Sequence, residues 1–467
     1  MSPVNPWMIL PFVLFLLSIA LLPFISKPWW EKNYTALSVL FALSTILYYI
    51  VGLDETGRVL RTGREYLSFI MLIGSLFVVA GGIHIRIRGN STPLLNVAVL
   101  GIGAVLSNLL GTTGASMVLI RPFLRVNRRR LRGFHVVFFI FIVSNIGGAL
   151  TPIGDPPLFL GYLRGVPFFW VLGSVWHIWA LTIGLVLAVF FALDLASFRK
   201  FEAAGVRERD LHEEAEVTGL PNVFFLAVIL LAVFIERPVF LREAIMLAAA
   251  CGSYLTTRPD VHRKNGFTLR PLREVAVLFV GIFATMMPAL DWLEANASRI
   301  GLSTPGQFYW GTGILSSLLD NAPTYLSFLS ASVGLLVSPE TAARIGELIS
   351  AHVSAPAAGL HSVEIGRAID LLAHYHPAMV AAGSAPADDI RVAYIMANHG
   401  IFLKAISVAA VFFGSNTYIG NGPNLLVKSI AEEAGAPTPG FLGYMVRYSL
   451  PVLLPIFALV WWLFFRG

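Results

Sequence analysis

The chain has 467 residues, of which 56% are hydrophobic and only 13% are charged, and its mean hydropathy is +0.75. These values lie outside the range of soluble domains and predict a membrane protein with many transmembrane helices. The net charge of +6 reflects the lysines and arginines of the loops, which orient helices in a bilayer, so we expect no nucleic-acid partner. A single cysteine, Cys251, excludes an internal disulfide.

The first apolar run, 7–26, has the length of a full span and no Lys or Arg before it. We therefore interpret it as a transmembrane helix and not as a signal peptide. Further apolar runs follow along the whole chain. The expected spans are 7–26, 34–53, 66–85, a split run at 92–124, 134–162, 167–194, 221–236, 241–257, 274–290, a second split run at 304–336, 392–430 and 444–465.

The split run 92–124 is polar and rich in glycine at its centre, 107–116. Arg86 and Arg88 precede it, and six arginines follow it between positions 121 and 132. Because short basic loops stay in the cytoplasm, both ends are expected on the inside, which predicts a re-entrant hairpin. The same topology makes 304–336 a hairpin that enters from the outside, so the second half would have the opposite orientation to the first.

The run 134–162 contains the motif SNIGGALTPIGDPPLFLG at 144–161, whose glycines and prolines break a helix at membrane depth. Broken backbone is tolerated there only where it is buried in protein or lines a cavity, so the break indicates a binding site. The motif SNTYIGNGPNL at 415–425 repeats its key residues in order, and LSNLLG at 106–111 resembles LSSLLD at 315–320. Paired interruptions in two halves are typical of secondary transporters with inverted repeats.

The expected fold is thus an all-α polytopic membrane protein with two inverted repeats, each with a re-entrant hairpin and a broken transmembrane helix. We predict a first repeat at 1–195, a cytoplasmic linker at 196–220 and a second repeat at 221–467. The linker is highly charged between 199 and 216 and is expected to be a solvated amphipathic segment. An insertion rich in Ala, Ser and Pro at 338–390 is expected on the outer surface, with helical periodicity at 365–374.

Four motifs of the chain resemble the ion transporter superfamily, most closely the NhaD-type sodium/proton antiporters and the citrate-transporter-like proteins. They are SNIGGALTPIGDPPLFLG at 144–161, LLGTTGASMVLIRP at 109–122, LDNAPTYL at 319–326 and SNTYIGNGPN at 415–424. The resemblance covers nearly the whole chain outside the insertion. It implies a homodimer with an elevator-like motion, in which hairpin tips and unwound segments hold the ions. Relatives carry sodium, arsenite, citrate or dicarboxylates on one architecture.

Asp155 and Asp320 are the two acids within the predicted membrane-embedded motifs, where an ionisable group is usually functional. A carboxylate among amide, hydroxyl and carbonyl oxygens suits Na⁺, and burial lets a proton compete for it, so both acids are predicted sodium ligands. Capping of a half-helix is the alternative role, and it is compatible with ion binding. The remaining candidate ion- or substrate-binding residues are Asn108, Thr112, Thr113, Asn145, Thr151, Asn321, Thr324, Lys404, Asn416, Thr417, Asn421 and Asn424.

Lys404 follows Arg391 by 13 residues and would lie roughly 20 Å into its span, where it could balance an acid or bind a carboxylate. Two acids with one deep lysine favour a cation as substrate. The first hypothesis is therefore Na⁺/H⁺ antiport across the inner membrane, and the alternative is cation- or proton-coupled symport of citrate or another small carboxylate. No constellation typical of an enzyme stands in a fitting context, and no cofactor is expected.

Overall fold

The computed structural model describes residues 4–86, 91–203, 216–235, 237–353 and 361–466. Within these residues, eight helices are long and apolar enough to cross a membrane. They confirm the prediction of an all-α protein that crosses the membrane several times. The eight helices are Pro6–Pro23, Lys27–Gly52, Thr56–Gly81, Pro93–Asn127, Phe168–Ala203, Arg270–Arg299, Ala387–Asn416 and Phe441–Phe464.

Of the first three long helices, the second and third begin earlier than the apolar runs indicate. They are α1 (Leu10–Ile25), preceded by the turn η1 (Pro6–Ile9), α2 (Lys27–Leu47), continued by the π-helical turn η2 (Tyr48–Gly52), and α3 (Thr56–Gly81). The expected starts at 34 and 66 are wrong. Pro28 stands in the first turn of α2, where a proline is tolerated, and charged residues form the first turns of α3.

Helix α4 (Pro93–Asn127) is folded back on itself at Gly111, whose φ of 72° is readily adopted only by glycine. The side-chain amides of Asn96 and Asn127 exchange two hydrogen bonds of 2.8 Å between its two ends. A straight helix would hold these two residues roughly 46 Å apart. The hairpin predicted at 92–124 is therefore confirmed, and its tip lies in the glycine-rich centre. Which face of the membrane its ends occupy stays a prediction.

The predicted break in the run 134–162 is also confirmed. Helices α5 (Gly133–Ile142) and α6 (Pro156–Leu163) are separated by residues 143–155, whose only helical turn is η3 (Ile146–Gly148). The next helix, α7 (Phe168–Ala203), continues past the expected end at 194 into the predicted linker. Residues 204–215 of that linker lie outside the described residues.

The start of the second half departs most from the predicted spans. Its elements are α8 (Pro221–Ala232), α9 (Leu241–Thr256), α10 (Pro259–Asn265), α11 (Arg270–Asn296) and η4 (Ala297–Arg299). Helices α8 and α9 are shorter than the roughly 20 residues of a full span, and α11 is longer than the expected 274–290. A two-stranded antiparallel sheet, which the all-α prediction lacks, pairs β1 (His84–Arg86) with β2 (Glu216–Thr218).

A second hairpin is formed by α12 (Pro305–Leu318) and α13 (Asn321–Leu336), as the split run at 304–336 predicts. Thr304 and Gln307 form a capping box at the start of α12, and Leu319 is extended at the turn. The rings of Phe308 and Phe328 lie 6.1 Å apart, so the two arms are side by side and antiparallel.

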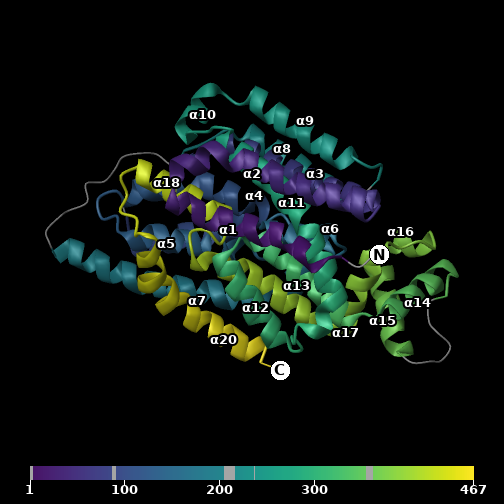
Figure 1. The fold of residues 1–467 in the computed structure, drawn as a ribbon. Coiled ribbons are helices and arrows are strands. Elements are labelled where there is room, and N and C mark those ends of the chain that lie inside the picture. Colours follow the sequence, from purple (N-terminus) through teal and green to yellow (C-terminus); the bar gives the residue numbers. More distant parts are fainter. Residues whose placement is uncertain (1–3, 87–90, 204–215, 236, 354–360, 467) are drawn as a thin grey trace.

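The described part of the insertion 338–390 is mainly helical, and two of its helices bury apolar side chains. It contains α14 (Pro339–Ser350), α15 (Ser362–Tyr375) and α16 (Pro377–Ala381), which gather at one end of the molecule (Figure 1), while residues 354–360 lie outside the described residues. The predicted periodicity at 365–374 is confirmed, because α15 buries Ile365, Ile369 and Leu372 and packs against α17 (Ala387–Phe413).

The last helices carry the second break. After α17 come the turn η5 (Gly414–Asn416), α18 (Gly422–Glu433), α19 (Phe441–Tyr444), the π-helical segment η6 (Met445–Leu453) and α20 (Leu454–Phe464). The break lies inside the expected run 392–430, which confirms that prediction.

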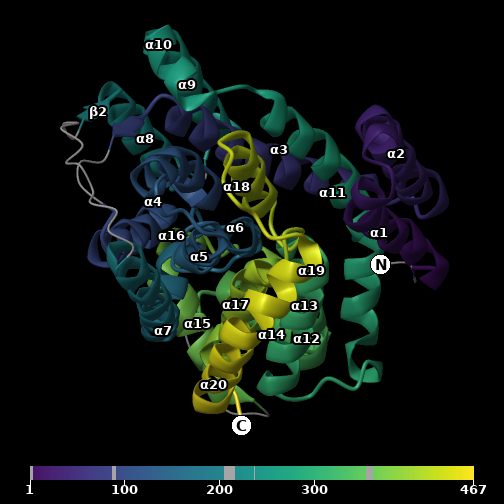
Figure 2. The same cartoon turned by 90° about the vertical axis from the view of Figure 1, so that its left-hand side faces the viewer.

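The two halves are packed into each other around the breaks. Helix α13 of the second half packs against α6 of the first, and α4 of the first half packs against α18 of the second. Figure 2 shows α5, α6 and α17 in the middle of the molecule, with α2 at one edge and α4 and α7 toward the other. Residues 135–146, which run from the first turn of α5 to the start of η3, are all buried. The first broken helix therefore lies in the core.

Candidate functional site

Four half-helices begin at one place in the core. The second arm of α4 starts at Thr112, α6 starts after Asp155, α13 after Asp320 and α18 after Asn421. The first turn of a helix exposes unpaired N–H groups and carries partial positive charge. Four such ends close together therefore favour a negative or strongly polar group between them.

The group at this meeting point is the carboxylate of Asp155, which is 1% exposed. Its Oδ1 accepts hydrogen bonds from Thr112 Oγ1 at 2.8 Å and from Asn421 Nδ2 at 2.9 Å, and its Oδ2 accepts one from Asn321 Nδ2 at 2.6 Å. All three donors are neutral, and no Lys, Arg or His of the described residues forms an ion pair with Asp155. The structure thus brings one residue from each of the two hairpins and the second broken helix to one acid of the first broken helix.

A chain of buried amides extends from this carboxylate. Asn421 Nδ2 also lies 3.2 Å from Asn145 Oδ1 and 3.3 Å from the carbonyl oxygen of Ser144. Asn145 Nδ2 in turn donates to Asn424 Oδ1 at 2.7 Å. Asn424 Nδ2 donates to the carbonyl oxygens of Gly414 and Thr417, both at 2.9 Å. These amides satisfy the unwound backbone of both halves and connect it across the molecule.

Each unwound segment is tied to the hairpin of its own half by a threonine. Thr151 Oγ1 donates to the carbonyl oxygen of Asn108 at 2.7 Å and accepts from the Gly154 N–H at 3.1 Å. Thr417 Oγ1 donates to the carbonyl oxygen of Ser317 at 2.7 Å and accepts from the Gly420 N–H at 3.1 Å. The side chain of Asn108 adds hydrogen bonds to Gly147 and Leu150, so its role is to brace the backbone.

In both unwound segments, 143–155 and 414–421, a glycine packs closely against a carbonyl group of the same segment. A Cβ on Gly154 would lie 2.1 Å from the carbonyl oxygen of Gly148, and a Cβ on Gly420 would lie 2.6 Å from that of Gly414. Neither position leaves room for a side chain. Counting from these glycines, Asp155 of the first loop corresponds to Asn421 of the second.

The chain was compared with protein families and with curated proteins. A family model described as "putative citrate transport" matches residues 1–465. The chain belongs to this family. The match confirms the predicted membership of the ion transporter superfamily among citrate-transporter-like proteins, and with the apolar helices it identifies a multi-pass membrane protein of a secondary transporter family. The comparison with curated proteins gives no match.

Within this transporter fold, Asn321 has an unusual role at the centre. It is fully buried, and its Nδ2 donates to Asp155. Its Oδ1 has no hydrogen-bond partner among the described residues. A buried amide oxygen without a hydrogen-bond partner lowers the free energy of unfolding by about 1–3 kcal/mol. A bound donor or cation would remove this loss. Asn321 Oδ1 and the Asp155 carboxylate are oxygen ligands of the type that hard cations prefer.

The second predicted acid, Asp320, does not share this centre's hydrogen bonds. It is half-buried, and its Oδ1 accepts from the N–H of Ala322 at 3.0 Å, so it caps α13. Thr324 Oγ1 donates to the carbonyl oxygen of Asp320 at 2.9 Å and closes the first turn of the same helix. These two predicted site residues therefore shape the hairpin tip. Of the two roles considered for Asp320, sodium ligand and helix cap, its contacts in the structure correspond to the helix cap.

Three further predicted residues lie apart from the Asp155 cluster. Asn416 Nδ2 donates to Ser317 Oγ at 2.9 Å, away from the position that Asn145 takes, so the Ser-Asn pairs of the two motifs are not equivalent. Thr113 is half-buried and makes no side-chain hydrogen bond to the described residues. Lys404 is also half-buried and forms no ion pair within the described part of the chain.

Sequence reasoning missed another completely buried acid, Asp194 on α7. It accepts hydrogen bonds from Arg130, from His135 Nε2 at 3.0 Å and from Asn96 Nδ2 at 2.8 Å, and it joins the open end of the α4 hairpin to α5 and α7. Its position as the last residue of an expected span concealed it, because an acid at a helix end is normally solvated. Unlike Asp155, it is fully paired with a cation.

Proposed function

We propose that this protein exchanges Na⁺ for H⁺ at one site built around Asp155, in the inner (plasma) membrane. The observation that carries the proposal is a fully buried carboxylate with three neutral donors and no basic partner, beside the unpartnered amide oxygen of Asn321. An unpaired buried charge is costly, so such a carboxylate binds either a proton or a cation.

The same oxygen atoms serve both ions. With Na⁺ bound, Asp155 and Asn321 Oδ1 supply oxygen ligands and the amide of Asn321 can still hold the carboxylate. With a proton bound, the neutral acid can donate a hydrogen bond in place of the cation. Because both ions need the same carboxylate, they compete, and the apparent Michaelis constant for Na⁺ should rise as the pH falls.

We further propose that the chain consists of two inverted repeats, 1–195 and 221–467, joined by a cytoplasmic linker at 196–220. The matched contacts of Thr151 with Asn108 and of Thr417 with Ser317, together with the matched glycine pairs, support this division. In the resulting arrangement the α4 hairpin opens to the cytoplasm and the α12–α13 hairpin opens to the outside. A homodimer with an elevator-like motion is part of the same proposal.

The topology can be tested by cysteine labelling. Arg129 and Ser303 are exposed near the open ends of the two hairpins, and the exposed native Cys251 can be replaced by alanine. Single cysteines at these two positions should react with a membrane-impermeant reagent from opposite faces. Reaction of both from the same face would exclude inverted repeats.

The second candidate function is cation-coupled symport of a small carboxylate. It is favoured by the family description and by the half-helix N-termini of α6, α13 and α18, which suit an anion. In that case Asp155 would bind the coupling cation and the carboxylate would lie beside it. The absence of a basic side chain bonded to Asp155 within the described residues makes this the weaker candidate.

Purified protein in proteoliposomes separates the two candidates. A Na⁺ pulse should dissipate a preformed pH gradient, and citrate uptake driven by a Na⁺ or H⁺ gradient should stay at the level of empty liposomes. The Asp155→Asn variant is the matched control and should be inactive. Gradient-driven citrate uptake without Na⁺-induced proton movement would replace the antiport proposal with the symport candidate.

A further inference from the structure

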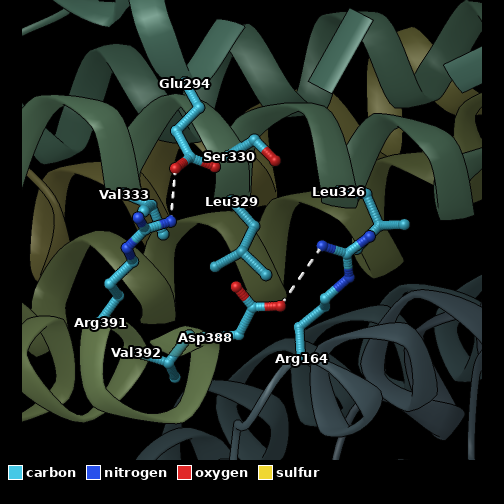
Figure 3. Close-up of a pocket in the computed structure, with 9 residues that line it drawn as sticks. All are labelled: Arg164, Glu294, Leu326, Leu329, Ser330, Val333, Asp388, Arg391 and Val392. Carbon is cyan, nitrogen blue, oxygen red and sulfur yellow. Dashed lines mark hydrogen bonds and ion pairs between the residues drawn. The ribbon is translucent and has the colours of Figure 1, made fainter. Parts of the chain in front are cut away.

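A small charged pocket lies on the same helices as the core site, at their opposite ends. It is lined by the charged residues Arg164, Glu294, Asp388 and Arg391 and by side chains of α13, which include Ser330 and Val333 (Figure 3). Its volume is about 30 Å³, which is enough for a water molecule. The pocket therefore provides a space with four charged side chains between α6, α11, α13 and α17.

The pocket lies at the far ends of the helices that begin at Asp155. Asp155 stands before the first residue of α6 and Arg164 after its last, while Asn321 starts α13 and Val333 lies near its end. Nine to twelve residues of helix correspond to roughly 14–18 Å. Positions 321, 325, 329 and 333 recur at the spacing that places residues on one face of a helix, so one face of α13 runs from Asn321 to the pocket.

Tyr325 stands between the two ends of this face. It is completely buried, and its hydroxyl group has no hydrogen-bond partner of ordinary geometry among the described residues, although Ser407 of α17 is near. Ser407 Oγ is likewise unpartnered. On the α6 side, a Cβ on Gly161 would lie only 2.3 Å from the Tyr325 hydroxyl oxygen, so Gly161 leaves space for that group. A buried tyrosine normally finds a partner, which makes this cluster exceptional.

We propose that the outer access route to Asp155 runs between α6, α13 and α17, from the charged pocket past the hydroxyl groups of Tyr325 and Ser407. This inference rests on the proposed ion exchange at Asp155 and names the path by which a small hydrated cation reaches that site. Tyr325 is a positioning residue in this route. Its hydroxyl supplies an oxygen to a passing cation, or a link in a proton relay, and its ring closes the path at rest.

Ion pairs hold the outer end of the route closed. Arg391 on α17 pairs with Glu294 on α11 at 2.6 Å, and Arg164 after α6 pairs with Glu65 on α3 at 2.9 Å and with Asp388 on α17 at 3.8 Å. These pairs join α6 and α17 to α3 and α11 across the pocket. Opening the route requires these ion pairs to separate. At the mouth of the pocket, water can replace each lost partner in turn.

The test uses single cysteines in a Cys251→Ala background. Ser330→Cys and Val333→Cys place a thiol at the pocket, and Ser384→Cys places one on the exposed insertion outside it. A membrane-impermeant thiol reagent added outside should modify all three. We expect modification to lower Na⁺/H⁺ exchange at least tenfold for the two pocket variants and to leave the Ser384→Cys variant unchanged. Full modification of both pocket variants without loss of exchange, or no modification of either, would overturn the route.

Tyr325 is tested separately. In the Tyr325→Phe variant we expect the maximal rate to fall about tenfold with the Michaelis constant for Na⁺ unchanged, because Tyr325 does not contact Asp155. A purely structural role predicts no loss, since the hydroxyl has no partner to lose. Gly161→Ala should slow exchange by displacing the ring, and Tyr325→Phe should partly restore the Gly161→Ala variant. An unchanged rate in Tyr325→Phe would remove Tyr325 from the route.

Failure of this route can be distinguished from failure of the proposed function. Exchange by the unmodified protein tests whether Na⁺ and H⁺ are carried, and the Asp155→Asn variant tests whether Asp155 carries them. Only the sensitivity of exchange to modification at the pocket tests the route. A protein that exchanges ions and is insensitive at Ser330→Cys and Val333→Cys would keep its function and lose this inference.

Discussion

The two most deeply buried acids of the described residues, Asp155 and Asp194, should respond to neutralisation in opposite ways. Asp155 has three neutral partners, whereas Asp194 is paired with Arg130 and bonded to His135. Replacing each by asparagine keeps its size and removes its charge. We expect Asp155→Asn to fold nearly as the wild type does and to lose transport, and Asp194→Asn to lose stability.

The magnitude for Asp155→Asn follows from its contacts. The two hydrogen bonds from Thr112 and Asn421 to the remaining oxygen become neutral ones, and the Asn321 donor now faces an amide N–H group that cannot accept. At roughly 1 kcal/mol for each contact, this weakens the site by about 3 kcal/mol in total. In the opposite direction, the change removes a buried charge that costs several kcal/mol. The new amide N–H group can also donate to Asn321 Oδ1, which is unpartnered, if the Asn321 amide turns over. We therefore expect the free energy of unfolding to change by less than about 2 kcal/mol.

For Asp194→Asn, the weaker hydrogen bonds and the loss of the ion pair both lower the free energy of unfolding. Arg130 is 4% exposed and would keep a buried positive charge without its full partner. Breaking a buried ion pair from one side costs roughly 3–5 kcal/mol. The difference between the two variants should thus be several kcal/mol, although both changes are Asp to Asn and both sites are buried.

The assay compares thermal unfolding of the two purified variants in detergent with their Na⁺-induced proton flux in proteoliposomes. Asp155→Asn should unfold within a few degrees of the wild type and show at least about a hundredfold lower flux, which corresponds to roughly 2.7 kcal/mol of lost ion interaction. If Asp155→Asn unfolds as early as Asp194→Asn, Asp155 is structural. If it keeps sodium-dependent flux, the exchange site lies elsewhere.

Three other changes test parts of the site. Asn321→Ala removes both the donor to Asp155 and the free oxygen, so the apparent Michaelis constant for Na⁺ in flux assays should rise at least tenfold with folding kept. Gly154→Ala forces a Cβ to within 2.1 Å of a carbonyl oxygen and should lower the unfolding temperature clearly, whereas Gly422→Ala, with open space around it, should not. Lys404→Met should leave Na⁺/H⁺ exchange near the wild-type level because Lys404 pairs with no acid in the described residues, and a loss of exchange in transport assays would contradict this placement.

The hairpins and broken helices could be predicted because their signal is local. Glycine and proline at membrane depth have few explanations, and Gly111, with its positive φ, stands at the tip that the glycine-rich run indicates. Asp155 was predicted as an ion ligand because an acid within such a break is expensive unless it has a function. The structure buries it at the centre of the molecule, and its role in ion binding stays a prediction. Helix ends were predicted less well, since hydropathy marks the apolar part of a helix and α3 and α7 continue into charged turns.

The composition of the site could be predicted only in part, because contacts between the halves depend on packing. Nothing local distinguishes Asn321, which donates to Asp155 from 166 positions away, from Asn416, which does not reach it. Matching the motifs by their Ser-Asn pairs also made Asn145 and Asn416 appear equivalent. Each loop has one glycine packed against a carbonyl group, Gly154 in the first and Gly420 in the second. Aligning the two motifs on these glycines gives the correspondence that the contacts in the structure support.

That register shows that the two matched loops carry one acid between them. The first loop carries Asp155 where the second carries Asn421, and the amide of Asn421 donates to the carboxylate of Asp155. A second acid at that position would face the first at hydrogen-bond distance, and the pair could not both ionise without a bound cation between them. One carboxylate between two matched loops instead suits one monovalent cation or one proton at a time.

A single charge also provides the coupling that exchange requires. In the proposed exchange, bound Na⁺ or H⁺ neutralises Asp155, and the protein can then seal the site from both sides. With neither bound, the carboxylate keeps its charge with no basic partner among the described residues, and sealing it costs several kcal/mol. A difference of about 3 kcal/mol makes passage of the empty site more than a hundred times rarer than that of the loaded one. In the proposed mechanism, the free-energy cost of sealing the empty site couples inward movement of one ion to outward movement of the other. No separate gate is needed for each ion.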